Sequence, residues 1–105
     1  MLTDPLWGST LDRIAFDVCT QSLAIFVHVT RGAVSTRHEL NLSGVTDFHF
    51  VNSIPGPWEY VELTELHFER DPSSDSWTFA LLLWSDDSSM TGRCVAVTLD
   101  GADLN

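Results

Sequence analysis

The four histidines of the chain are the side chains best suited to metal or proton chemistry: His28, His38, His49 and His67. Two imidazoles on one metal are expected at the i, i+2 spacing of a strand or the i, i+4 spacing of a helix, and no pair has either spacing. No Cys-x-x-Cys motif accompanies them. Convergence in space stays open, but the spacing favours histidines scattered over a sheet, and we predict no metal site.

His67 lies between two acids, Glu65 and Glu69, that would share its face of a strand. An imidazole beside a carboxylate can transfer a proton, so this group could support acid–base catalysis. The same arrangement is a common polar contact on a sheet surface, and nothing in the sequence marks a pocket around it. We therefore interpret it as a polar pair.

Turn chemistry explains the remaining clusters of acids and serines. Asp71 and Asp75 flank a run of proline and serine, and Asp86-Asp87 precedes two more serines. Neither cluster has the ligand order of an EF-hand. The chain has no Gly-rich phosphate loop and no basic patch. We predict no catalytic residues, no cofactor and no enzymatic activity.

The segment from Phe48 to Arg70 combines aromatic side chains with carboxylates around a Pro-Gly-Pro break. This combination favours a recognition surface, because tyrosine and tryptophan anchor interfaces while acids select a basic partner. On a strand, Tyr60 and Glu62 would share one face; on a helix, Trp58, Glu62 and Glu65 would cluster. The predicted partner-binding residues are Trp58, Tyr60, Glu62 and Glu65. The alternative is that both aromatic residues belong to the core and the glutamates form a solvated rim.

The charge balance limits the kind of partner. Fifteen acids against five arginines give a net charge of −10. Phosphate backbones and anionic membranes would be repelled, so we predict neither nucleic-acid nor membrane binding. A basic protein would be attracted and would associate faster. The alternative is that the charge serves solubility alone.

The two cysteines and the N-terminal segment predict a cytoplasmic protein. A secreted domain of 105 residues would be expected to carry more cysteines than Cys19 and Cys94. The N-terminal residues lack the basic and apolar regions of a signal peptide. The longest apolar run, residues 79–84, is too short to span a bilayer. We expect both cysteines to be reduced residues of the core.

Alternation of apolar and polar residues predicts strands along most of the chain. The expected strands cover residues 13–18, 23–30, 34–42, 66–69, 77–84 and 93–99. Turn formers at Thr30–Ala33 and Asp71–Ser76 should close hairpins, and residues 86–89 should form a further turn. Helical periodicity is weak throughout, although residues 58–66 could form one or two helical turns after Pro57.

These elements predict one all-β domain over residues 1–105, an antiparallel β-sandwich or small open barrel of about six to seven strands. The strand that begins at Trp77 is apolar on both faces in its second half, so it should be central. Its core residues are expected to be Trp77, Phe79, Leu81 and Leu83. The first ten residues and the last four are expected to be loose ends.

The chain resembles the YxiG-like family of small bacterial proteins. The resemblance spans nearly the whole chain and rests on apolar patterning together with the Trp-x-Tyr-x-Glu-Leu-x-Glu segment from Trp58 to Glu65. The family has no established catalytic residues to transfer. Its members look like companions of polymorphic-toxin loci, which implies an immunity-type role.

We therefore expect a non-enzymatic protein-binding module, an immunity protein or antitoxin that covers a basic toxin domain. The alternative is a small-ligand-binding or structural β domain, in which Trp77 and Trp84 would line a cavity between sheets.

Overall fold

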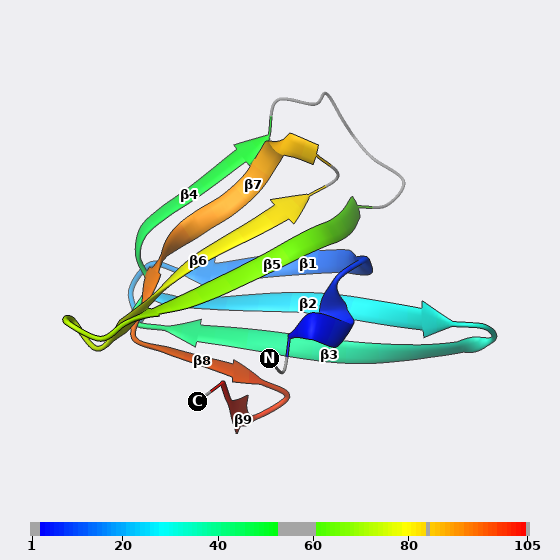
Figure 1. The fold of residues 1–105 in the computed structure, drawn as a ribbon, viewed down its shortest axis with the longest axis horizontal. Coiled ribbons are helices and arrows are strands. Elements are labelled where there is room, and N and C mark those ends of the chain that lie inside the picture. The colour runs from blue at the N-terminus through cyan, green and yellow to red at the C-terminus, as the bar shows by residue number, and fades with distance from the viewer. Residues whose placement is uncertain (1–2, 53–60, 84, 105) are drawn as a thin grey trace.

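The computed structural model describes residues 3–52, 61–83 and 85–104, and these residues form nine strands and one short 3-10 helix (Figure 1). In chain order the elements are η1 (Asp4–Leu6), β1 (Ser9–Asp17), β2 (Ser22–Arg31), β3 (Val34–Ser43), β4 (Thr46–Asn52), β5 (Val61–Asp71), β6 (Ser76–Leu83), β7 (Ser85–Cys94), β8 (Ala96–Leu99) and β9 (Ala102–Asp103). Every strand pairing is antiparallel. The predicted all-β, antiparallel class is confirmed, with more strands than expected.

The nine strands form one open sheet in the order β4-β7-β6-β5-β1-β2-β3-β8-β9. A short seam joins β1 to β5, where the register covers three residue pairs, from Ser9–Leu63 to Leu11–Val61. This short junction lets the sheet fold over on itself. We call β4, β7, β6 and β5 the β5 half, and β1, β2, β3, β8 and β9 the β2 half. In Figure 1 the strands of the β5 half run obliquely above those of the β2 half, and the two sets approach each other at the left of the view.

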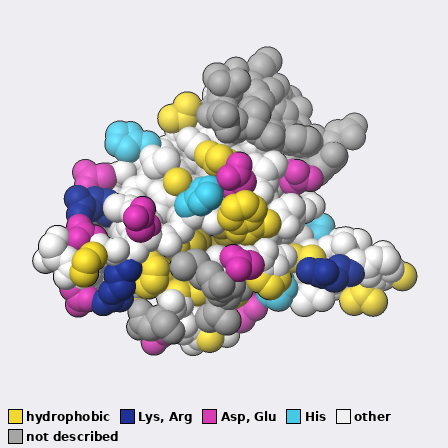
Figure 2. Space-filling model, in the orientation of Figure 1, with side chains coloured by type: hydrophobic (Ala, Val, Ile, Leu, Met, Phe, Trp, Pro, Cys, Tyr) yellow, Lys and Arg dark blue, Asp and Glu magenta, His cyan; other side chains and the backbone are white. Residues whose placement is uncertain are grey.

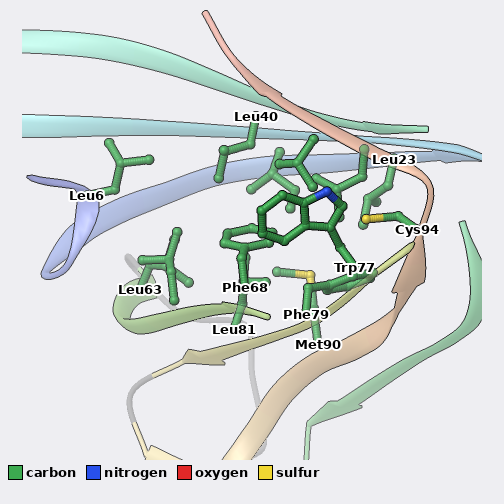
Figure 3. Close-up of a cluster of buried hydrophobic side chains, with 14 of the residues drawn as sticks. Leu6, Leu23, Leu40, Leu63, Phe68, Trp77, Phe79, Leu81, Met90 and Cys94 are labelled. Carbon is green, nitrogen blue, oxygen red and sulfur yellow. The ribbon is translucent and has the colours of Figure 1, made fainter. Parts of the chain in front are cut away.

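One hydrophobic core fills the space between the two halves. Leu23 and Leu40 reach it from the β2 half, while Leu63, Phe68 and Met90 reach it from the β5 half (Figure 3). The predicted core residues of β6 are all buried, with exposed fractions of 6% for Trp77, 3% for Phe79 and 0% for Leu81 and Leu83. β6 lies between β5 and β7, so its predicted central position is also confirmed.

Both predicted hairpins are present. Arg31 pairs with Val34 across a two-residue loop, and Gly32 takes the positive φ of +62° that a tight hairpin turn requires. Asp71 pairs with Ser76 across the second loop. There the backbone N–H and hydroxyl of Ser73 both donate to the Asp71 carboxylate, and these hydrogen bonds lower its pKa.

The turn expected at residues 86–89 is wrong, because these residues belong to β7. Ser88 and Ser89 pair with β4, and Ser89 also pairs with β6, so backbone hydrogen bonds to neighbouring strands override a turn-like composition. Ser88 is fully buried, and its hydroxyl donates to the Asn52 side chain. Because Ser88 is polar and yet faces the core, this part of β7 lacks the alternation of apolar and polar residues that predicts a strand.

The single strand expected at residues 93–99 is two strands in different halves. β7 ends at Cys94 and β8 begins at Ala96, so the chain crosses between the halves at Val95. The chain also crosses at Gly44, between β3 and β4, and the two crossings touch. The Val95 N–H donates to the Ser43 carbonyl at 2.8 Å.

The first ten and last four residues were expected to be loose ends, but each of these segments contributes a buried residue. Leu6 is 1% exposed and Leu104 is 7% exposed, and both belong to the core. The cysteines are both free but differ in environment. Cys94 is buried, and burial raises its pKa to about 11, whereas Cys19 lies exposed in the turn after β1 and is not a core residue as expected.

Candidate functional site

The structure places two of the four predicted partner-binding residues. Glu62 and Glu65 lie on β5, while Trp58 and Tyr60 lie outside the described residues. Strict alternation from Glu62 would turn Glu65 toward the core. A β-bulge at Thr64 changes this, because the β5–β6 register steps from Leu63 directly to Glu65. Both glutamates therefore lie on the outer face of the sheet.

The bulge aligns a row of polar side chains along the outer face of β5. Glu65, His67 and Glu69 alternate with the buried Leu66 and Phe68. The Nε2 atom of His67 lies 3.0 Å from a carboxylate oxygen of Glu65. This is the polar pair expected from the sequence.

An exposed tryptophan lies beside this row. The ring of Trp7 meets the ring of His67 edge-on, with 5.3 Å between centroids and 74° between planes. Trp7 is 44% exposed, one of the largest hydrophobic side chains at the surface of the described chain. We call Trp7, Glu62, Glu65, His67 and Glu69 the acidic face. Figure 2 shows acidic and histidine side chains interspersed with hydrophobic ones on the side of the molecule where β5 lies in front.

The local sequence explains the position of Trp7. Pro5 begins the short helix η1, whose Leu6 enters the core, and the chain then turns at Gly8 with a φ of +82°. The Gly8 N–H donates to the Leu63 carbonyl at 2.8 Å, which fixes the segment to β5. Sequence reasoning missed Trp7 because it treated the first ten residues as loose. The available signal was an apolar pair, Leu6-Trp7, between a proline and a glycine.

The acidic face retains its negative charge. Among the residues that the structure describes, the carboxylates of Glu62 and Glu69 have no ion-pair partner. By contrast, the arginines of the β5–β6 and β7 region bind aspartates of the turn: Arg70 pairs with Asp75, and Arg93 lies 3.6 Å from Asp71. These two carboxylates can therefore attract a cation from a partner without first breaking an internal ion pair.

The histidines do not converge. His28 bonds to Asp12 at 2.7 Å and His38 to Asp100 at 2.7 Å, on strands apart from His67. Within residues 3–52, 61–83 and 85–104, no group of three or more histidine, cysteine or acidic side chains could hold a metal ion. Each of these three histidines instead bonds to a single carboxylate.

The Asp100 contact fixes the turn between β8 and β9. Its carboxylate accepts one hydrogen bond from His38 and a second from the Glu39 N–H at 2.8 Å. Partial burial raises the pKa of Asp100, but these hydrogen bonds and the nearby imidazole outweigh it and lower the pKa overall.

Trp77 is a core residue, and Trp84, the other tryptophan expected to line an internal cavity, lies outside the described residues. In the described ranges, no helix has the length and apolarity needed to span a bilayer.

Comparison with known proteins gives no relatives: no protein-family model matches the chain, and no curated protein matches it at a significant level. We therefore infer function from the geometry of the acidic face.

Proposed function

We propose that this protein is a non-enzymatic binding module that recognises a basic protein domain through its acidic face. The observation that carries the proposal is the exposed Trp7 ring against His67 of β5, a strand whose outer face also carries the unpaired carboxylates of Glu62 and Glu69. A tryptophan supplies a large contact area at small cost in conformational entropy. The surrounding carboxylates supply specificity and speed association with a cationic partner.

Because the chain resembles the YxiG-like family, for which an immunity-type role is implied, we propose a toxin domain as the basic partner. In this role the protein acts stoichiometrically in the cytoplasm: the acidic face covers the basic cleft through which a nuclease-like toxin binds its substrate. Complexes of this type can approach the upper limit of non-covalent affinity, because they combine a buried anchor with complementary charge. No catalytic group on the binding module is needed for this inhibition.

The test begins with partner capture from the native host, followed by binding kinetics with the purified partner. Trp7→Ala should raise the dissociation rate by roughly 30-fold or more, as loss of an interface anchor does. Phe50→Ala is the matched control, since Phe50 is 46% exposed but lies on β4. It should change the dissociation rate little.

The charge of the same face is tested with the double variant Glu62→Lys/Glu65→Lys. It should slow association, and the effect should shrink as salt rises. If Trp7→Ala and the double variant both bind the captured partner as the parent does, the acidic face is not the interface.

A further inference from the structure

A second polar site lies on the outer face of the β2 half. Thr10 of β1 separates it from the acidic face, because Thr10 pairs with His28 on one side and with Glu62 on the other. β1, β2 and β3 form there a surface hollow of about 540 Å³. We use the name arginine hollow for four of the residues that line it: Arg13, Phe26, His28 and Arg37. The register brings them together, because Arg13 pairs with Phe26 across β1–β2 and His28 pairs with Arg37 across β2–β3.

The two arginines of the hollow lack acidic partners. Within the described residues, neither Arg13 nor Arg37 has a carboxylate within 4.0 Å. The chain has fifteen acids and five arginines, so partners for these cations are abundant elsewhere. Keeping two guanidinium groups unpaired in one hollow leaves a local positive potential that an anion can use.

Arg13 is held in a geometry that suits anion binding. Its guanidinium carbon lies 4.4 Å from the centre of the Phe26 ring. Stacking uses the face of the guanidinium group and leaves its N–H donors available in the plane. These donors match two oxygens of a carboxylate or phosphate group in a bidentate contact.

His28 is oriented in the same hollow. Its Nδ1 lies 2.7 Å from the Asp12 carboxylate, and this contact leaves Nε2 on the opposite edge of the ring. Two carboxylates at the hollow are already engaged: Asp12, which itself lines the hollow, bonds to His28, and Glu39 accepts a hydrogen bond from Asn41 at 2.6 Å. Neither carboxylate neutralises an arginine of the hollow.

We propose that the arginine hollow binds a small oxyanion, with the guanidinium groups of Arg13 and Arg37 as its principal donors and Phe26 as the floor. The ligand carries a phosphate or a carboxylate group, and both present the paired oxygens that arginine recognises. This site goes beyond the proposed function, because it lies on the other half of the sheet and has the opposite charge preference. The net charge of −10 opposes anions at long range, so binding depends on these local donors.

The experiment is a titration of the ¹⁵N-labelled full chain with sodium phosphate and, separately, with sodium succinate, at constant ionic strength. We expect saturable shifts at the amides of Phe26, His28 and Arg37. The probe that binds more tightly distinguishes a phosphate ligand from a carboxylate ligand. If neither probe gives saturable shifts at these amides, the proposal is overturned.

Substitutions separate the site from the general charge of the protein. Arg13→Gln and Arg37→Gln should each weaken binding about tenfold or more, as loss of a charge-assisted contact does. Arg31→Gln removes the same charge from the exposed end of β2, outside the hollow, and should weaken binding less than about twofold. Equal losses in all three variants would overturn the site. Arg37→Lys, which keeps the charge without the planar fork, should give an intermediate affinity and guards against a folding defect in Arg37→Gln.

Discussion

Tryptophans at two points of this chain show how position on the sheet decides the role of a residue. Trp77 is 6% exposed and packs between the halves, whereas Trp7 is 44% exposed beside His67. Both are equally hydrophobic, so composition does not distinguish them. The face of the sheet on which each ring lies makes one a core residue and the other an anchor available to a partner.

Leu81 on β6 allows a direct test of the core. It is fully buried, while its neighbour Leu82 lies on the outer face and is half-buried. Leu81→Ala should lower the free energy of unfolding by about 2–5 kcal/mol, because it removes buried methyl groups and leaves a cavity. Leu82→Ala is the control and should cost less than half as much. Chemical denaturation measures both, and a similar loss in the two variants would contradict the assigned register.

Asp100 predicts a pH dependence of stability. Its pKa is lowered in the folded protein, so its contribution is present above the unfolded pKa of about 3.9 and is lost as the pH falls through the folded value. Asp100→Asn removes this titration while keeping the shape of the side chain. Thermal unfolding from pH 6 to pH 2.5 should show the variant less stable at pH 6, with the difference narrowing below about pH 4. A constant difference over this range would exclude the contribution of Asp100.

At the scale of the elements, the two crossings between the halves are the points that define the fold. The chain leaves the β2 half at Gly44 and returns to it at Val95, and the backbone of Val95 bonds to Ser43. Gly44 has a φ of +62°, and a Cβ added to it would lie 2.6 Å from Cγ2 of Val95. Glycine is therefore required there both for its backbone conformation and for the close approach of the second crossing.

Gly44→Ala and Gly32→Ala test this requirement as a matched pair. Both glycines have a φ of +62°, but no atom lies within 4 Å of a Cβ added to Gly32. Gly32→Ala should cost about 1–2 kcal/mol, the penalty of an L-residue in the left-handed region. Gly44→Ala should cost clearly more, because the crossing at Val95 must also move. Equal unfolding free energies for the two variants would show that the crossings tolerate separation.

The whole molecule carries its charge unevenly. Three of the five arginines, Arg13, Arg31 and Arg37, lie on the first three strands, while the unpaired glutamates of the acidic face lie on β5. The net charge of −10 is therefore the sum over two surfaces that differ in their local charge. One is suited to a basic partner and the other has local donors for an anion.

Association with the proposed basic partner should depend on where a charge is reversed. Glu69→Lys changes the acidic face, and Asp103→Lys makes the same change of charge on β9, at the far edge of the sheet. Glu69→Lys should slow association more, and the difference should fall as ionic strength rises above about 0.1 M, where the Debye length is roughly 10 Å. Stopped-flow measurement over a salt series gives both rates. Identical salt dependence in the two variants would mean that net charge alone steers the partner.

Local patterns in the sequence were sufficient for β2, β3 and β6, for parts of β1 and β5, for the two hairpins and for the core face of β6. Alternation with a period of two reports which side chains share a face, and glycine or aspartate in a short loop reports a turn; both signals come from neighbours in the chain. Alternation also places Glu62 on the outer face of β5, whereas by itself it would turn Glu65 toward the core.

The tertiary structure decided what depends on pairing between distant strands. β7 forms because two neighbouring strands hydrogen-bond to it, although Ser88 and the residues around it favour a turn. The bulge at Thr64, which aligns Glu62 with Glu65, exists only in the register with β6. Trp7 reaches His67, and Arg13 shares a hollow with Arg37, through contacts between residues far apart in the chain. Such contacts carry no local signal, because the free energy that selects them comes from packing the two halves around one core.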